Sequence, residues 1–437
     1  MKNKARFIIP VIIENIFTVT ASLVLSYVTG AISKTSLSVA TVGNQAMSLI
    51  NSLFMVMSTG AAITTAHEIG REDKHAASRT AEHALFLTPV LSILVTGVLL
   101  IASKPIMSLL MPGAGKDFLK EGTQYFNIIA LSIPAMALGN TIKGVLRATG
   151  DSKSAMNATF IGCIVQVVGV WLFTSRLGLG IAGSALATLS LRYISCFYIL
   201  YVMLKNNRSL TIERSRVFKL DKSQIQLILR NGLPNVFDAC AVQTGYVIIN
   251  SMLVSLGENE SAVFNVINTV LLFTGICQDI GSVSATVLVG QLTGAGNHKG
   301  AVRTFLRILI IAELVSFLLC LPTVLCPDFC ARLFAKDADV IKGSADFMWI
   351  MYPYCFVAVG CNVCEPSVRA RGYGKFAMVE TILCVLCLRL PLTWLMCIKL
   401  RLGVPGMYAA NITSLTVRFT LSFIRACKID RQRSIAQ

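Results

Sequence analysis

The sequence predicts an all-α integral membrane protein with twelve transmembrane helices, arranged as two pseudo-symmetric six-helix lobes around a central cavity. Three observations predict this fold. Hydrophobic residues make up 54% of the 437 residues and charged residues only 14%, whereas soluble domains carry about 25% charged residues. Several uncharged stretches are long enough to cross a membrane. Finally, motifs of the first half return in the second half about 223 residues later.

The uncharged stretches indicate helices and not a β-barrel. Residues 84–102 and 154–175 contain no charged side chain, and each can cross a hydrocarbon core of about 30 Å as a helix. Backbone groups in lipid must be satisfied internally, so only helices or a closed barrel can span it. A barrel would alternate apolar and polar residues, and these runs do not alternate.

In the amino-terminal half, breaks rich in glycine, proline and charge separate six apolar segments. The first follows six mostly polar and basic residues and is too long for the apolar core of a signal peptide. The second ends at the charged turn around Gly70, the fourth at Gly150 and the fifth at Arg176. The six expected spans cover roughly 7–30, 38–66, 82–103, 121–146, 153–175 and 180–204.

The carboxyl-terminal half repeats this pattern, with breaks at Gly294, Gly372 and Arg401. Its expected spans cover roughly 225–256, 260–292, 301–325, 343–368, 374–399 and 404–427. Because the number of spans is even, both termini are expected on one side of the membrane.

The distribution of basic residues predicts which side that is. Twenty-five lysines and arginines fall on the side of the termini and ten on the other, so the termini and their loops are expected to be cytoplasmic. Loops that face lipid headgroups account for the net charge of +17. The sequence therefore predicts a multi-pass protein of the cell membrane, with lipid as a partner and no nucleic acid.

The most polar stretch divides the chain into two lobes. Residues 205–224 are expected to form a cytoplasmic linker between an amino-terminal lobe, 1–204, and a carboxyl-terminal lobe, 225–437. Six spans per lobe give both lobes the same orientation, so the pseudo-symmetry axis is expected to run along the membrane normal.

The internal repeat keeps a nearly constant offset. Five positions return after 224 residues, and a basic turn and a glycine pair return after 222 and 223. The pairs are Pro10 and Pro234, Glu14 and Asp238, Asn44 and Asn268, Gly70 and Gly294, Arg79 and Arg303, Arg147 and Arg369, Lys153 and Lys375, and Gly180 and Gly403. Two copies of one structural unit around a shared cavity are typical of secondary transporters.

At these motifs the chain resembles the multidrug and toxic compound extrusion (MATE) family. The resemblance rests on the Pro-x-x-x-acid start of each half, the loops at Gly70 and Gly294-Ala295-Gly296, and above all the turn Leu146-Arg147-Ala148-Thr149-Gly150-Asp151-Ser152-Lys153. It implies two six-helix lobes in a V around a central cavity. It also implies export of amphipathic cationic compounds in exchange for Na⁺ or H⁺ by alternating access.

The resemblance has one departure. Many members carry an aspartate late in the first span, at the position that Leu25 occupies here. The coupling site is therefore expected in the carboxyl-terminal lobe. We expect a monomer that carries a small-molecule substrate, without a cofactor or bound metal beyond the coupling ion.

Acidic residues inside spans are the main site candidates, because an ionisable group there costs at least about 2.5–3.5 kcal/mol and usually faces a cavity or a partner. Asp238 is the first choice, with a solvated interface position as the alternative. Asp279, with Gln278 as a neutral ligand, is the second, unless it pairs with a buried arginine. Glu365 either binds an ion or pairs with the nearby basic turn. Glu14 either mirrors Asp238 or serves helix-start electrostatics.

Other candidates follow from the repeat and from side-chain chemistry. Asn44 and Asn268 join the predicted ion- or substrate-binding set. The turn residues Arg147, Lys153, Arg369 and Lys375 are expected at the cytoplasmic interface, either as gating residues or as topology anchors alone. Aromatic and sulfur-containing side chains are expected to line substrate walls, since aromatic rings attract organic cations, or simply to pack: Phe54, Met55, Met57, Tyr246, Phe264, Phe273 and Tyr354.

Two rival functions remain. A flippase for lipid-linked or polysaccharide precursors would keep the fold, and the intramembrane residues Arg192, Arg389 and Arg418 leave that alternative open. An enzyme is not expected, because no histidine–acid, metal-ligand or serine nucleophile motif recurs across the spans. The pairs Cys361-x-x-Cys364 and Cys384-x-x-Cys387 have zinc-like spacing but lie in apolar spans, so we interpret them as packing residues.

Overall fold

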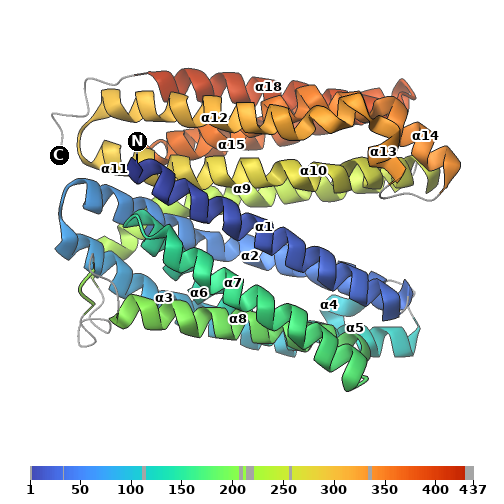
Figure 1. Cartoon of the computed structure of the whole chain (residues 1–437), viewed down its shortest axis with the longest axis horizontal. Coiled ribbons are helices and arrows are strands. Elements are labelled where there is room, and N and C mark those ends of the chain that lie inside the picture. The colour runs from blue at the N-terminus through green and yellow to red at the C-terminus, as the bar shows by residue number, and fades with distance from the viewer. Residues whose placement is uncertain are drawn as a thin grey trace. The chain divides into compact units, whose positions relative to one another are not determined.

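The computed structural model describes residues 2–32, 34–110, 115–205, 210–212, 221–254, 258–332 and 337–428, and they are helical almost throughout (Figure 1). No β-strand occurs among these residues. Each of the twelve expected spans coincides with one helix or with consecutive helical segments. Most of the expected linker, 206–209 and 213–220, lies outside the described residues.

The chain forms two compact units, Met1–Val236 and Phe237–Gln437. The division falls inside α9 (Lys222–Val254), so this helix contributes to both units. The other helices of the amino-terminal unit are α1 (Lys2–Ile32), α2 (Lys34–Gly70), α3 (Lys74–Ile101), α4 (Ser103–Leu110), α5 (Lys116–Leu131), α6 (Ile133–Ala148), α7 (Ser152–Val170), the π-helical turn η1 (Trp171–Arg176) and α8 (Gly180–Lys205).

Within the amino-terminal unit, α7 packs between α1 and α8, and α2 packs against α3 and α6. Two apolar clusters fill the interior. One is built around Tyr125, Phe126 and Met107, and the other around Leu146 and Ile199. These clusters hold α6 against α2, α3, α7 and α8, and the Arg147 side chain at its basic end reaches Glu14 of α1.

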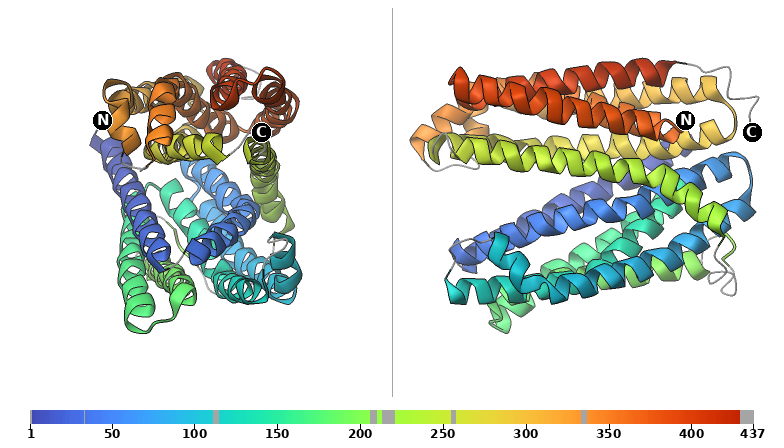
Figure 2. Two further views of the ribbon diagram at one scale, coloured as in Figure 1. Left: turned by 90° about the vertical axis from the view of Figure 1, so that its right-hand side faces the viewer. Right: turned by 180° about the vertical axis from the view of Figure 1, so that it is seen from behind.

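The carboxyl-terminal unit is built around α15 (Met351–Ala370), which contacts α10 (Glu258–Ser284), α12 (His298–Leu325) and α18 (Gly403–Cys427). Figure 1 and the reverse view in Figure 2 show α12 and α18 running along it. The remaining segments of this unit are η2 (Ala285–Val289), α11 (Gly290–Gly294), α13 (Pro327–Arg332), α14 (Ala338–Phe347), η3 (Met348–Ile350), α16 (Gly374–Ile382), η4 (Leu383–Arg389), α17 (Leu390–Thr393) and η5 (Trp394–Lys399).

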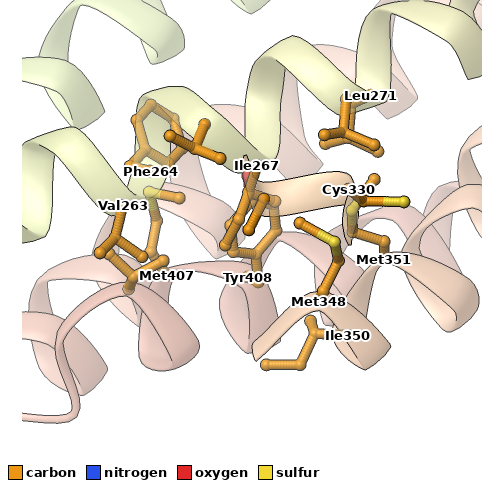
Figure 3. Close-up of a cluster of buried hydrophobic side chains, with 14 of the residues drawn as sticks. Val263, Phe264, Ile267, Leu271, Cys330, Met348, Ile350, Met351, Met407 and Tyr408 are labelled. Atoms are coloured by element: carbon orange, nitrogen blue, oxygen red, sulfur yellow. The ribbon is translucent and has the colours of Figure 1, made fainter. Parts of the chain in front are cut away.

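An apolar core lies at one end of this unit (Figure 3). Phe264 and Ile267 from α10 meet Met348, Met351 and Tyr408 there. The Tyr408 ring packs against Phe264 at 6.0 Å and edge-on against Tyr354 at 5.8 Å between ring centroids. Such aromatic pairs add about 0.5–1.5 kcal/mol to the burial of their area.

Within the described residues, nine helices are long and apolar enough to cross a membrane, and ten if the bent pair Ala262–Leu271 and Gly275–Gly294 counts as one span. The helices α9 and α18 are not among the ten. Both carry charged side chains along their length, Asp238 in α9 and Arg418 in α18. A charged side chain inside a membrane is costly unless it has a partner. We therefore expect Asp238 and Arg418 to be paired with side chains of neighbouring helices.

The sharp turns after α6 and α15 share their backbone geometry. Gly150 and Gly372 have φ of 94° and 84°, the left-handed region that glycine enters without strain. Gly70 and Gly294 instead close helices. The left-handed residues of those two turns are Glu72, with φ of 62°, and Gly296, with φ of 70°.

Helices α2 and α9 cross at two glycines of the amino-terminal unit. A β-carbon added to Gly60 would lie 2.3 Å from the carbonyl oxygen of Ile228, and one added to Gly232 would lie 2.0 Å from that of Val56. Nearby, the Asn231 side chain donates a hydrogen bond to Thr64 Oγ1 at 3.0 Å. The first turns of α9 are therefore fixed to α2 by direct backbone contact.

Candidate functional site

The amino-terminal unit contains a buried ionic cluster around Glu14, one turn after Pro10 in α1. Arg147 Nη2, from the end of α6, donates to Glu14 Oε2 at 2.6 Å. Thr159 Oγ1, from α7, donates to Glu14 Oε1 at 2.7 Å. Lys143 lies one turn before Arg147, and its Nζ is 3.9 Å from Glu14 Oε1 and 2.8 Å from Thr159 Oγ1. One carboxylate thus joins three helices and two cations.

The carboxyl-terminal unit contains the corresponding cluster around Asp238 of α9. Arg369 Nη2, from the end of α15, donates to Asp238 Oδ2 at 2.5 Å and lies 3.3 Å from Glu365 Oε2, one turn earlier on the same helix. Arg418 of α18 lies 2.5 Å from Glu365 Oε1 and 3.9 Å from Asp238 Oδ1. These four side chains form a ring in which acids and arginines alternate.

The ring is buried and tied to further polar groups. Asp238, Glu365 and Arg418 are each at most 9% exposed. Arg418 Nη2 also donates to Thr381 Oγ1 of α16 at 2.9 Å. Taking a charge out of water costs several kcal/mol, and close opposite charges offset that cost only while every partner stays in place. The ring is therefore sensitive to any change in one of its four charges.

The repeat relates the two clusters position by position. The pairs Glu14–Arg147 and Asp238–Arg369 are equivalent, and so are Thr159 and Thr381. One turn before the arginine, however, the amino-terminal unit has a lysine and the carboxyl-terminal unit a glutamate, Lys143 and Glu365. The charge at this position is thus reversed between the halves, and Arg418, which the repeat aligns with Ser195, supplies the second cation of the ring.

The other predicted site residues lie outside the two clusters. Asp279 on α10 has an exposed side chain, and its neighbour Gln278 accepts a hydrogen bond from Asn362 of α15 at 3.0 Å. Asn44 is exposed and hydrogen-bonded to Tyr125, and Asn268 accepts a hydrogen bond from the Tyr408 hydroxyl at 3.5 Å.

The four predicted turn residues divide into two kinds. Lys153 and Lys375 are exposed, whereas Arg147 and Arg369 turn inward to the acids of their own unit.

The predicted substrate-wall side chains also differ in exposure. Phe54, Met57 and Phe264 are buried in apolar cores, while Met55 and Tyr246 are exposed. The Phe273 side chain lies outside the described part. All fourteen cysteines are free thiols, and no group of metal-ligating side chains occurs in the described residues.

Sequence reasoning missed Lys143 and Thr159, and it named Arg418 as an intramembrane arginine without placing it beside Asp238 and Glu365. All three residues lie on helices other than those of the acids that they contact, and side-chain geometry shows these contacts. A signal was available for Lys143, because it stands one turn before Arg147 as Glu365 stands one turn before Arg369. Reading the repeat for differences as well as identities would have found this reversed charge.

Two repeated helical units with buried ion pairs inside their membrane-spanning segments define a polytopic membrane transporter built by duplication. The comparisons with known proteins give the family. The MatE family matches residues 10–172 and again 234–395, so each half of the chain carries one copy of the family's repeat. The chain belongs to the MatE family, whose members are transporters of small molecules and not enzymes.

Relatives and solved structures agree with this assignment. The chain is 23% identical to the Probable multidrug resistance protein NorM of Thermotoga maritima over 431 residues, 97% of this chain and 91% of that protein. It is 23% identical to the Uncharacterized transporter YisQ of Bacillus subtilis over 399 residues, 89% of this chain and 86% of that protein.

Two solved structures share the fold, each with a TM-score of 0.91 and 22% identity over 97% of this chain and 94% of the other. One is an outward-facing multidrug resistance MATE family transporter of the MOP superfamily. The other is a MOP superfamily transporter from Pyrococcus furiosus, described as having a binding pocket of reverse polarity that suggests a different function.

Proposed function

We propose that this protein is a secondary antiporter that exports amphipathic organic cations in exchange for Na⁺ or H⁺ by alternating access. It would act as a monomer in the cell membrane, with both termini in the cytoplasm and its basic loops against lipid headgroups. The observation that carries the proposal is the buried carboxylate of α9, Asp238, held by arginines of two other helices.

The ring suggests how an ion could be coupled to movement. Asp238 links α9 to α15 through Arg369 and to α18 through Arg418. A proton or Na⁺ on the carboxylate would cancel the charge that holds both arginines, so ion binding would loosen α9 from its neighbours. A ligand shifts a conformational equilibrium only by its differential affinity for the two states. A coupling ion would bind more tightly to the state in which the arginines have released Asp238 than to the state in which they hold it. Asp279 remains a second proposed ion ligand, together with Gln278.

The flippase alternative is less well supported by the buried arginines. Arg418 is neutralised by Glu365 at 2.5 Å, and Arg192 donates to the Ser132 hydroxyl at 2.7 Å. The charge of Arg418 is therefore offset by the protein itself, and one donor of Arg192 is already used within the amino-terminal unit, which leaves less cationic surface for a phosphorylated lipid.

The test is ethidium export from proteoliposomes, with a Na⁺ gradient and a pH gradient imposed separately. The wild-type protein should export the dye with one of the gradients. Asp238→Asn should abolish the gradient-dependent part while leaving membrane insertion intact, because a neutral amide cannot exchange a cation. Asp339→Asn, at the exposed start of α14, is the matched control and should export normally. Normal gradient-driven export by both Asp238→Asn and Asp279→Asn would refute the site assignment.

A further inference from the structure

A second charged group of the carboxyl-terminal unit lies outside the ionic ring. Arg389, the last residue of η4, is only 6% exposed. Its guanidinium carbon lies 4.7 Å from the centre of the Tyr246 ring of α9. Among the described residues, no carboxylate forms an ion pair with it, and its buried Nε has no hydrogen-bond partner.

The other inward-facing arginines of this unit differ from Arg389 in their partners. Arg418 and Arg369 pair with the acids of the ring, although their Nε atoms also lack a hydrogen bond, and Arg371 donates to the main-chain carbonyls of Ala426 and Lys428 at the end of α18. A buried cation without a carboxylate partner is costly in a spanning helix, and such a group usually marks a ligand pathway. Within the described part of the chain, Arg389 is such a cation.

The chemistry of the pair Arg389 and Tyr246 suits an anion attached to an aromatic body. A guanidinium offers a planar fork of donors that matches a carboxylate or another oxyanion. The ring of Tyr246, which already lies against Arg389, offers a flat surface to the aromatic body.

One of the side chains against the cation reaches the surface. Tyr246 lies over the guanidinium and is itself 37% exposed, so a ligand that stacks on this ring would also come close to Arg389.

We infer that Arg389 and Tyr246 form a subsite for the anionic group of an aromatic substrate, such as an aryl carboxylate or sulfonate. This inference rests on the proposed transport function and refines its substrate class, from simple organic cations to amphipathic compounds that also carry an anion. The ionic ring handles the coupling ion, and Arg389 recognises the negative end of the cargo.

The experiment compares two dyes that differ in one charge, rhodamine B with its free aryl carboxylate and its methyl ester. Binding to the full-length protein in lipid nanodiscs is followed by fluorescence anisotropy. The wild-type protein should bind the acid more tightly than the ester. Arg389→Gln should weaken binding of the acid roughly tenfold, as expected for the loss of a charge-assisted hydrogen bond, and leave binding of the ester unchanged.

Two further variants control for folding and for cation–π contacts in general. Arg389→Lys keeps the charge and should retain most of the preference for the acid. Arg176→Gln removes a similar contact from an exposed pair, since Arg176 lies 5.1 Å from the Trp171 ring, and should bind both dyes as the wild type does.

Equal wild-type affinity for the acid and the ester would overturn the inference even if Arg389→Gln failed to fold. Equal weakening of both dyes in Arg389→Gln would overturn it as well. Failure of gradient-driven ethidium export would contradict the proposed antiport and would not alter the dye-binding comparison.

Discussion

The two units of this transporter hold the same acid–arginine pair but surround it with opposite charge. Glu14–Arg147 in the first unit and Asp238–Arg369 in the second occupy equivalent positions, at 2.6 and 2.5 Å. One turn before the arginine, the first unit has a lysine and the second a glutamate. The first cluster therefore has one acid and two cations, whereas the second has two acids and two cations.

This difference shows which part of the duplicated unit is structural and which has diverged. The acid–arginine pair ties α1 to the end of α6 in the first unit and α9 to the end of α15 in the second. Both copies of the repeat keep this pair. The two copies differ at the residue one turn before the arginine, which is Lys143 in the first and Glu365 in the second. The added acid Glu365 pairs with Arg418, at the position that Ser195 occupies in the first copy. In the proposed antiport, an ion that binds to the ring of four charges would allow its arginines to change partners. The amino-terminal cluster has a single acid held by two cations, so we expect it to stay closed.

The largest effect is expected when the ring loses its second cation. Arg418→Met leaves Glu365 and Asp238 with Arg369 alone, and breaking a buried pair by removing one partner costs about 3–5 kcal/mol. Thermal unfolding in detergent should show this loss, together with the absence of gradient-driven export. Arg176→Gln, an exposed arginine, is the control and should unfold like the wild type. A wild-type unfolding temperature for Arg418→Met would show that the ring is not a stabilising unit.

A smaller effect is expected when the amino-terminal cluster is converted to the carboxyl-terminal pattern. Lys143→Glu places a second acid beside Glu14, at a cost of about 2–3 kcal/mol because Arg147 still neutralises one of the two. Adding Ser195→Arg should recover part of that loss, since it supplies the cation that Arg418 supplies in the other unit.

The double-mutant cycle of these two changes measures the coupling directly. Additive effects would mean that side chains at positions 143 and 195 do not interact as Glu365 and Arg418 do. That result would contradict the equivalence of the two clusters.

The smallest effect concerns left-handed backbone positions. Glu72 has φ of 62° where the other unit has Gly296, and Arg401 has φ of 53° where the first unit has Gly178. A non-glycine residue in this region costs about 1–2 kcal/mol, so Glu72→Gly and Arg401→Gly should each raise stability by up to about 1 kcal/mol after the entropy of glycine is subtracted.

Thermal unfolding of the two variants and their combination checks this expectation. Gly150→Ala introduces a side chain at φ of 94°. As a control, it should lower the unfolding temperature where the two glycine variants raise it. Destabilisation by both glycine variants would contradict the strain argument.

The sequence predicted the helical membrane fold and the duplication well, because hydrophobic length and a constant repeat offset are local and cumulative signals. It also identified Glu14, Asp238 and Glu365 as buried acids of interest. It could not show that Arg147 and Arg369 turn inward, because a basic residue at a helix end reaches headgroups or a neighbouring helix with the same side chain. The ion pair of Arg418 with Glu365 depends on which face of α18 packs against α15. The positions of apolar segments in the sequence do not determine that face.

The close crossing at Gly60 and Gly232 bears on how the protein is made. The segment of α9 up to Val236 belongs to the first unit, although the repeat assigns the whole helix to the second copy. The first copy of the repeat therefore does not contain the whole first unit, and during synthesis that unit gains its last segment only when the start of the second copy has been made. The second unit, Phe237–Gln437, contains no segment of the first copy. The dependence between the two copies thus runs in one direction.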